Sequence, residues 1–142
     1  MSTAITEGVI LDGKYRVERI LGRGGMGVVA LATHLGIGHK VAVKLLVEGA
    51  SDEVVARFLR EARASVRLKS EHVARVLDVG ELADGAPFMV MEYLEGSDLS
   101  VVLKARGALP VHEAVQHVLD ACEAIAEAHG AGIVHRDLKP AN

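Results

Sequence analysis

The chain has 142 residues, of which 50% are hydrophobic and 25% charged, a balance typical of one globular domain with a hydrophobic core. Its net charge of −3 gives no electrostatic basis for binding to nucleic acid or to a membrane surface. The single cysteine, Cys122, excludes an internal disulfide and is typical of proteins in a reducing compartment.

The amino-terminal segment carries no sign of secretion. Residues 1–13 lack a basic stretch followed by an apolar one, and no apolar run in the chain reaches the roughly 18 residues that span a bilayer. We therefore expect a cytoplasmic location, either as a free protein or as the cytoplasmic part of a larger, membrane-anchored one.

Short runs of β-branched residues predict strands in the first half of the chain. Tyr15, Val17 and Arg19 alternate before a glycine-rich turn, and Ala83-Asp84-Gly85 forms a turn further on. The hairpin-like links between the runs predict an antiparallel sheet of five strands, which are expected at residues 15–19, 28–32, 41–43, 73–79 and 88–93.

One helix is expected between the third and fourth strands. Asp52 and Glu53 place negative charge in its first turn, where the helix dipole favours it. Apolar residues then recur at helical spacing, at Val55, Phe58, Leu59, Ala62 and Val66.

The second half of the chain is patterned as helices. Ser97 or Asp98 is expected to cap a short helix that Gly107 ends, and Pro110 is expected to begin a longer one. One apolar stripe follows, with Cys122 in it as a core residue, before Gly130 and Gly132 end the helix: Val111, Ala114, Val115, Val118, Leu119, Cys122, Ile125 and Ala126. A short strand is expected at Ile133-Val134. A strand-rich part and a helical part predict two lobes, linked by residues 92–96.

The segment from Gly22 to Val29 has the pattern G-x-G-x-x-G-x-V. Glycines let a backbone approach phosphate oxygens closely and present N–H groups to them, although the pattern by itself also fits a glycine-rich hairpin. A dinucleotide fold would need a helix next, whereas Val28 and Val29 continue as a strand. A Walker loop would need Gly-Lys-Ser/Thr, which is absent from the sequence.

Lys44 ends the β-branched run Val41-Ala42-Val43. A lone lysine there is usually a surface residue, but beside the glycine loop it can neutralise phosphate charge if a carboxylate holds it. Glu61, three residues after Phe58 on the predicted helix, is the candidate carboxylate. The alternative for Glu61 is a solvated pair with Arg57 or Arg60.

The segment His135-Arg136-Asp137-Leu138-Lys139-Pro140-Ala141-Asn142 carries the strongest signal. Asp137 can accept a hydroxyl proton, Lys139 can steady a moving phosphoryl group, and the amide oxygen of Asn142 can ligate Mg²⁺. The remaining histidines show no metal-ligand spacing.

Together these motifs, in this order and spacing, resemble the protein kinase family, most closely bacterial kinases of the eukaryotic-like serine/threonine type. The resemblance covers Tyr15 to Asn142. It implies an α+β, protein-kinase-like two-lobe fold: an antiparallel five-stranded N-lobe with one helix, plus the first helices of a truncated C-lobe. Residues 15–93 would form the N-lobe and hinge, and residues 94–142 the start of the C-lobe through the catalytic loop.

The resemblance also implies a role for each motif residue. The backbone at Gly22, Gly24 and Gly27 would cover the ATP phosphates, and Lys44, paired with Glu61, would hold two of them. Adenine would lie among Leu21, Val29 and Ala42, beside the gatekeeper Met91 and the hinge backbone of Glu92 and Leu94, with Asp98 at the ribose. Asp137 would be the catalytic base, Lys139 the γ-phosphate contact and Asn142 a Mg²⁺ ligand.

The implied reaction is transfer of the ATP γ-phosphoryl group to serine or threonine hydroxyls of a protein substrate. A non-catalytic ATP-binding or regulatory fragment is the alternative. A small-molecule phosphotransferase usually carries His-Gly-Asp, so Arg136 and Lys139 argue against it. The family's Asp-Phe-Gly metal site and activation loop would lie beyond residue 142, so we expect these residues alone to be inactive.

Overall fold

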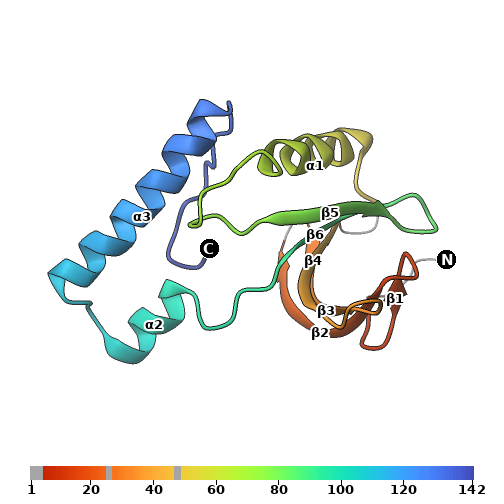
Figure 1. Ribbon diagram of the computed structural model, residues 1–142, viewed down its shortest axis with the longest axis horizontal. Helices are drawn as coiled ribbons and strands as arrows, with labels where there is room; N and C mark the ends of the chain where they lie inside the picture. The colour runs from red at the N-terminus through yellow and green to blue at the C-terminus, as the bar shows by residue number, and fades with distance from the viewer. Residues whose placement is uncertain (1–4, 25–26, 47–48) are drawn as a thin grey trace. The chain divides into compact units, whose positions relative to one another are not determined.

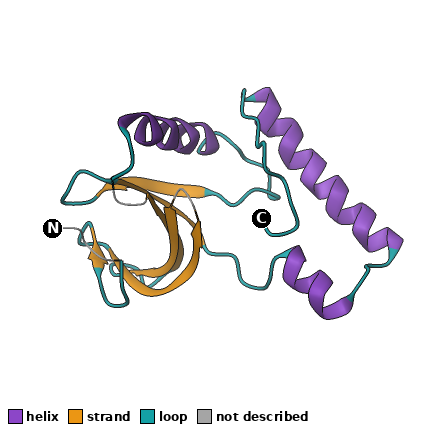
Figure 2. Cartoon of the chain, turned by 180° about the vertical axis from the view of Figure 1, so that it is seen from behind, coloured by secondary structure: helices purple, strands orange, loops and turns teal. Residues whose placement is uncertain are grey.

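The computed structural model describes residues 5–24, 27–46 and 49–142, and within them the chain forms two compact units (Figure 1). The first unit takes the described part of Met1–Val66 together with Ala74–Leu94, and the second takes Arg67–Val73 together with Glu95–Asn142. The strands, orange in Figure 2, and the helix at residues 52–65 belong to the first unit, and the helices at residues 99–106 and 111–130 belong to the second.

The first unit is built on an antiparallel sheet, as the hairpin-like links predicted. Its strands follow the order β1-β2-β3-β4-β6-β5, and the sheet curls strongly (Figure 1). The described residues contain six strands, one more than expected: β1 (Ile10–Leu11), β2 (Tyr15–Gly24), β3 (Gly27–His34), β4 (Lys40–Leu46), β5 (Val76–Glu81) and β6 (Pro87–Glu92). The sequence did not predict β1, because two residues are too few to show an alternating pattern.

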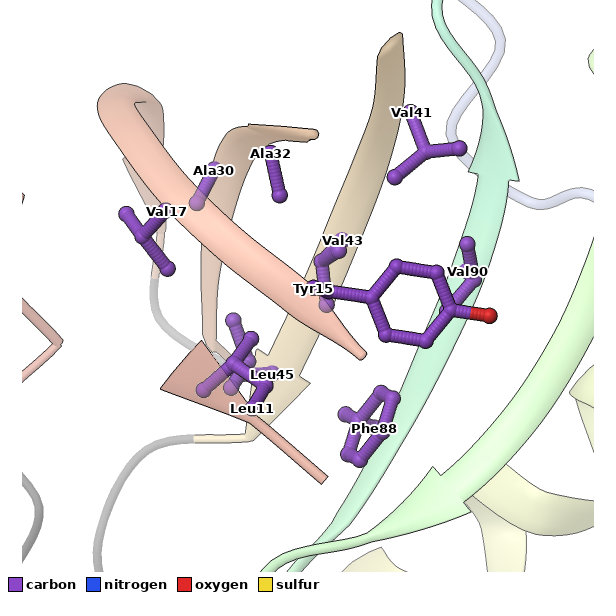
Figure 3. Packing of buried hydrophobic residues seen from close by; sticks show 10 residues of the cluster. All are labelled: Leu11, Tyr15, Val17, Ala30, Ala32, Val41, Val43, Leu45, Phe88 and Val90. Atoms are coloured by element: carbon purple, nitrogen blue, oxygen red, sulfur yellow. The ribbon is translucent and has the colours of Figure 1, made fainter. Parts of the chain in front are cut away.

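The main hydrophobic core covers one face of this sheet. Along β4, Val41, Val43 and Leu45 belong to the core while Ala42 and Lys44 point to the opposite face, as the period of two in a strand requires. Figure 3 shows ten core side chains packed toward one another. These are Leu11, Tyr15, Val17, Ala30, Ala32, Val41, Val43, Leu45, Phe88 and Val90.

Helix α1 (Asp52–Ser65) covers the opposite face, beside β5 and β6. Its amino terminus is capped by the Ser51 hydroxyl, which accepts a hydrogen bond from the Val54 N–H at 3.4 Å. Phe58 and Ala62 pack with Met89 in a second, smaller cluster. The predicted apolar stripe ends with these residues, since Val66 lies after the helix and is 57% exposed.

The second unit begins with α2 (Leu99–Arg106) and α3 (Val111–Gly130). Of the two candidate caps for α2, Asp98 is the residue used, and Gly107, at φ 75°, ends the helix as expected. Pro110 stands immediately before α3, also as expected. A bidentate ion pair ties the two helices together, because Arg106 Nη1 and Nη2 donate to the two oxygens of the Glu113 carboxylate at 2.7 and 2.9 Å.

Helix α3 buries a different face from the one its apolar stripe predicts. Its buried residues are Ala124 and Ala128, whereas the stripe is largely exposed, at Val111, Val115, Val118 and Leu119. The prediction that Cys122 is a core residue is therefore wrong: it is exposed, because it lies on the stripe side of the helix.

The predicted strand at Ile133-Val134 is also wrong. Both residues lie in a loop, and a strand needs a neighbouring strand that the described part of the second unit does not offer. Among the described helices, none combines the length and the apolar character needed to cross a membrane.

Candidate active site

Cross-strand pairing in the first unit lines up the residues that the sequence analysis assigned to phosphates. Gly22 on β2 pairs with Val29 on β3, and Val29 pairs with Lys44 on β4. Lys44 pairs in turn with Met89 on β6. Because paired residues share a face of the sheet, one row across four strands places Lys44 beside the strand that leaves the glycine loop.

A second row carries the residues expected at adenine. Leu31 on β3 pairs with Ala42 on β4, and Ala42 pairs with Met91 on β6. Ala42 is buried at 8% exposure, and Met91 packs against the cluster under α1. Leu21 lies where the register between β2 and β3 shifts and is 38% exposed. The sheet therefore gathers Leu31, Ala42 and Met91 on one face, next to the Lys44 row.

The glycines of the loop meet different surroundings. A Cβ added at Gly22 or Gly24 would meet open space, whereas one added at Gly27 would collide with the Leu45 carbonyl oxygen of the neighbouring strand. Gly27 is therefore required by the close approach of β3 to β4. The two positions between Gly24 and Gly27 lie outside the described residues.

The Lys44 ammonium lies over the Phe58 ring, 5.9 Å from its centroid. This is the outer range of a cation–π contact. Glu61 is exposed, and within the described residues no ion pair joins it to Lys44. The pair that the resemblance implies is thus absent from this structure, because the α1 face that meets the sheet presents Phe58 and Ala62 and not Glu61.

The backbone at the end of β6 is tied to the segment before β5. The Glu92 N–H donates to the Arg75 carbonyl at 2.9 Å, and the Glu92 carboxylate accepts from the Arg75 N–H at 2.8 Å. Leu94, two residues on, is 63% exposed. Side chain and main chain of Glu92 therefore fix the conformation of the strand end, from which Leu94 projects.

Asp98 in the second unit is engaged by its own helix. Its Oδ1 accepts hydrogen bonds from the Ser100 hydroxyl and from the Val101 N–H, the latter at 3.0 Å. These bonds, that from Ser100 first, lower the pKa of the Asp98 carboxyl. The carboxylate has a structural task as the cap of α2, and its contact with ribose stays a prediction.

The loop after α3 presents its charged residues to solvent. The Lys139 ammonium bonds to Asp137 Oδ2 at 2.9 Å, and both side chains are more than half exposed. This bond and the positive charge of Lys139 lower the pKa of the Asp137 carboxyl. The Asp137 N–H donates to His135 Nδ1 at 3.3 Å, and Arg136 between them has φ 64°, so the loop turns sharply just before Asp137.

Asn142 is folded back onto the same loop. Its Oδ1 accepts from the Lys139 N–H at 2.8 Å, and its own N–H donates to the Lys139 carbonyl at 3.1 Å. The Pro140 carbonyl accepts from the Ser100 N–H at 3.1 Å, which ties the loop to the start of α2. Asp137, Lys139 and Asn142 are thus held in one short, hydrogen-bonded turn.

The amide oxygen of Asn142 can supply one of the several ligands that Mg²⁺ needs. An amide oxygen has two lone pairs, and the Lys139 N–H uses one at Asn142. No group of three or more His, Cys, Asp or Glu side chains in the described residues could hold a metal alone. Mg²⁺ bound with nucleotide usually keeps waters and phosphate oxygens as most of its ligands, so a single amide fits.

Two polar contacts of the structure went unnoticed in the sequence. Tyr15 donates to Asp78, and Glu127 on α3 binds the backbone of Lys69 and Ser70. Helical spacing places Glu127 beside Ala124 and Ala128, but spacing gives no information about a partner 57 residues away.

The protein kinase domain family matches residues 15–142 of this chain. Among curated relatives, the serine/threonine-protein kinase pkn3 of Myxococcus xanthus is 46% identical over 131 residues, covering 91% of this chain and 24% of the relative. Serine/threonine-protein kinase PknH of Mycobacterium tuberculosis is 43% identical over 132 residues, covering 92% of this chain and 21% of the relative.

Among solved structures, the PknI kinase domain of Mycobacterium tuberculosis superposes with a TM-score of 0.81 at 38% identity, covering 98% of this chain and 57% of that one. This chain thus spans about a quarter or less of the two relatives and somewhat more than half of the solved kinase domain. From residue 15 to residue 142, the chain belongs to the protein kinase domain family, and the relatives reported above are bacterial serine/threonine-protein kinases.

Proposed function

We propose that this chain supplies the nucleotide-binding part and the catalytic loop of a serine/threonine protein kinase. The observation that carries the proposal is the exposed turn in which Lys139 bonds to Asp137 at 2.9 Å and Asn142 folds back onto Lys139. A carboxylate, a cation and an amide oxygen held together fit phosphoryl transfer, which depends on positioning and charge stabilisation.

In this proposal the first unit binds ATP. The exposed edge at Gly22 and Gly24 leaves room for phosphate oxygens near backbone N–H groups. Lys44, one strand pairing away from Val29, supplies positive charge for the phosphates. The apolar side chains at Leu21, Val29, Ala42 and Met91 offer a surface for the adenine ring, and Glu92 and Leu94 offer backbone polar groups.

Lys44 would reach the phosphates only after leaving the ring of Phe58. The contact at 5.9 Å is weak, on the order of 0.5–1 kcal/mol at an exposed site, so a phosphate easily competes for the ammonium. We propose that Glu61 takes the Phe58 position as partner of Lys44 when nucleotide is bound, which requires the carboxylate of α1 to turn toward the sheet.

The second unit carries out the transfer. Asp137 orients the substrate hydroxyl and accepts its proton, while Lys139 neutralises charge on the γ-phosphoryl group. Lys139 lowers the pKa of the Asp137 carboxyl further below neutral pH, so the group is a carboxylate that can accept a hydrogen bond from the substrate hydroxyl. Asn142 would hold Mg²⁺, which neutralises phosphate charge when bound. We place this reaction in the cytoplasm, where ATP and protein substrates are available.

Phosphoryl transfer and nucleotide binding must be measured together to test the proposal. The complete gene product containing these 142 residues is incubated with γ-labelled ATP and a generic basic protein, and labelled amino acids are identified after hydrolysis. Labelled phosphoserine and phosphothreonine are expected. ATP binding without transfer would support the non-catalytic alternative, and label on a small-molecule acceptor alone would contradict both.

A further inference from the structure

The segment Arg67–Val73 lies in the chain between two elements of the first unit yet belongs to the second. Helix α1 ends at Ser65, and β5 begins at Val76. Both are part of the first unit, whereas Arg67–Val73 groups with α2, α3 and the loop after them. Something on the second unit must therefore hold this segment.

Glu127 on α3 provides that hold. Its Oε1 accepts a hydrogen bond from the Lys69 N–H at 2.8 Å, and its Oε2 accepts one from the Ser70 N–H at 2.7 Å. Both carboxylate oxygens are used on consecutive backbone donors, and such charge-assisted bonds are roughly twice as strong as neutral ones. We call this arrangement the Glu127 clamp.

The surroundings favour this one residue over its acidic neighbours. Glu127 is half-buried and lies on the face of α3 that carries the buried Ala124 and Ala128. His72 Nε2, in the clamped segment, is 3.7 Å from Glu123, but Glu123 remains 69% exposed. Among the acidic residues of α3 that the structure describes, Glu127 is thus the one whose two carboxylate oxygens both accept hydrogen bonds from backbone N–H groups of Arg67–Val73.

The clamp is close in the chain to the catalytic loop. Three residues after Glu127 the helix ends at Gly130, and the Ile133 N–H donates to the Ala128 carbonyl at 2.9 Å, which fixes the exit from α3. His135 follows two residues later. At the other end of the clamp, one residue separates α1, which carries Glu61, from the clamped segment.

We propose that Glu127 is a positioning residue for phosphoryl transfer. By clamping Arg67–Val73 to α3, it fixes the helix that leads into the catalytic loop. A carboxylate fits this role, because each of its two oxygens accepts a hydrogen bond from a different backbone N–H. This inference rests on the proposed kinase function, since a positioning effect has meaning only for a reaction.

The test uses Glu127→Gln in the complete gene product, with Glu53→Gln, at an exposed position of α1, as the control for the same chemical change. Glutamine has almost the same shape but keeps only one acceptor oxygen, so one backbone N–H faces an NH₂ group. Amide hydrogen exchange of Lys69 and Ser70 reports the clamp directly. Steady-state kinetics reports kcat and the KM for ATP separately, and Glu127→Asp shows whether a shorter carboxylate restores either.

We expect Glu127→Gln to raise the exchange rate of at least one of the two amides by about tenfold or more and to lower kcat by about tenfold, as misplacement in positioning-based catalysis does. The KM for ATP should stay within about threefold, and Glu53→Gln should match wild type. Unchanged amide exchange, or lost protection with unchanged kcat, overturns the proposal. A wild-type protein without any transfer activity overturns the kinase function and the positioning role with it, whereas the amide exchange then still decides whether the clamp exists.

Discussion

The Tyr15 hydroxyl donates a hydrogen bond to Asp78 Oδ2 at 3.0 Å and so joins β2 to β5. In the order of the sheet, β3, β4 and β6 lie between these strands, so the bond closes the curl seen in Figure 1. The Tyr15 ring is buried at 4% exposure, edge-on to Phe88 with ring centroids 6.1 Å apart. The other oxygen of Asp78 accepts a hydrogen bond from the Val79 N–H, so the carboxylate also satisfies a backbone donor of the edge strand β5.

Replacing Tyr15 with phenylalanine should destabilise the first unit by about 1 kcal/mol. The substitution keeps the ring packing and removes one partly buried hydrogen bond, and such a bond contributes about that much. Urea unfolding compares the variant with wild type and with Tyr93→Phe as a control. A Tyr15→Phe protein as stable as wild type would mean that the closure of the sheet rests on packing alone.

The same residue predicts a loss of stability at high pH. Burial and the Asp78 carboxylate raise the pKa of Tyr15 to about 12 from its ordinary 10.0. An unfolded chain therefore loses this proton at lower pH than the folded one, so the stabilisation is complete below pH 10 and is lost as the pH rises toward 12. The sequence has two tyrosines and no tryptophan, so tyrosinate absorbance, taken as the difference between wild type and Tyr15→Phe, follows this group.

The sequence predicted the strands and helices where a pattern or cap was local. The β-branched run Val41–Val43 within β4, the helix end at Gly107 and the helix start at Pro110 are examples, and each depends only on neighbouring residues. The exposure of Cys122 could not be predicted, because an apolar stripe shows which side of a helix is hydrophobic but not what packs against it. The Lys44–Phe58 contact depends on how α1 is turned on the sheet, which spacing within the helix does not determine.

The glycines of the loop should separate into a structural one and functional ones. Gly27→Ala should destabilise the first unit by about 1–3 kcal/mol, the usual cost of overpacking, because its Cβ collides with the Leu45 carbonyl. Gly24→Ala should leave stability unchanged, since its Cβ meets open space, but should weaken ATP binding. Thermal unfolding and nucleotide affinity of both variants provide the comparison. Equal loss of stability in both would show that Gly24 is also constrained by packing.

Lys44→Met in the complete gene product should abolish phosphoryl transfer and leave the fold intact. Methionine can still rest on Phe58, so only the charge is removed, with a cost to stability of at most about 1 kcal/mol. Lys40→Met, on the same strand but exposed at its start, is the matched control and should retain activity. Turnover of the Lys44 variant at the wild-type rate in a labelled-ATP assay would remove Lys44 from the mechanism.

Asp137→Asn should keep ATP affinity within several-fold and reduce turnover by about 10²-fold or more, the scale of general-base roles. Its lowered pKa adds a pH signature: a fall in turnover on the acid side with an apparent pKa above the ordinary 3.8 of an aspartate must come from another group. In Lys139→Met the pKa of Asp137 should return toward normal. Affinity and turnover that fall together in Asp137→Asn would instead assign Asp137 to ground-state binding.

A polypeptide of only these 142 residues should be inactive and should self-associate. It contains no Asp-Phe-Gly segment, so phosphate charge would be neutralised poorly and the nucleotide misaligned. Helix α3 also exposes a row of large apolar side chains, with Val111 at 80%, Val118 at 61% and Leu119 at 56% exposure, and such patches promote association. The double variant Val118→Glu/Leu119→Glu should therefore raise the monomeric fraction in light scattering. Val101→Glu/Leu103→Glu, the same pair of added charges on α2, should not, because both residues lie outside the row. Wild-type polypeptide that stays monomeric at high concentration and phosphorylates a basic protein would contradict both parts of the prediction.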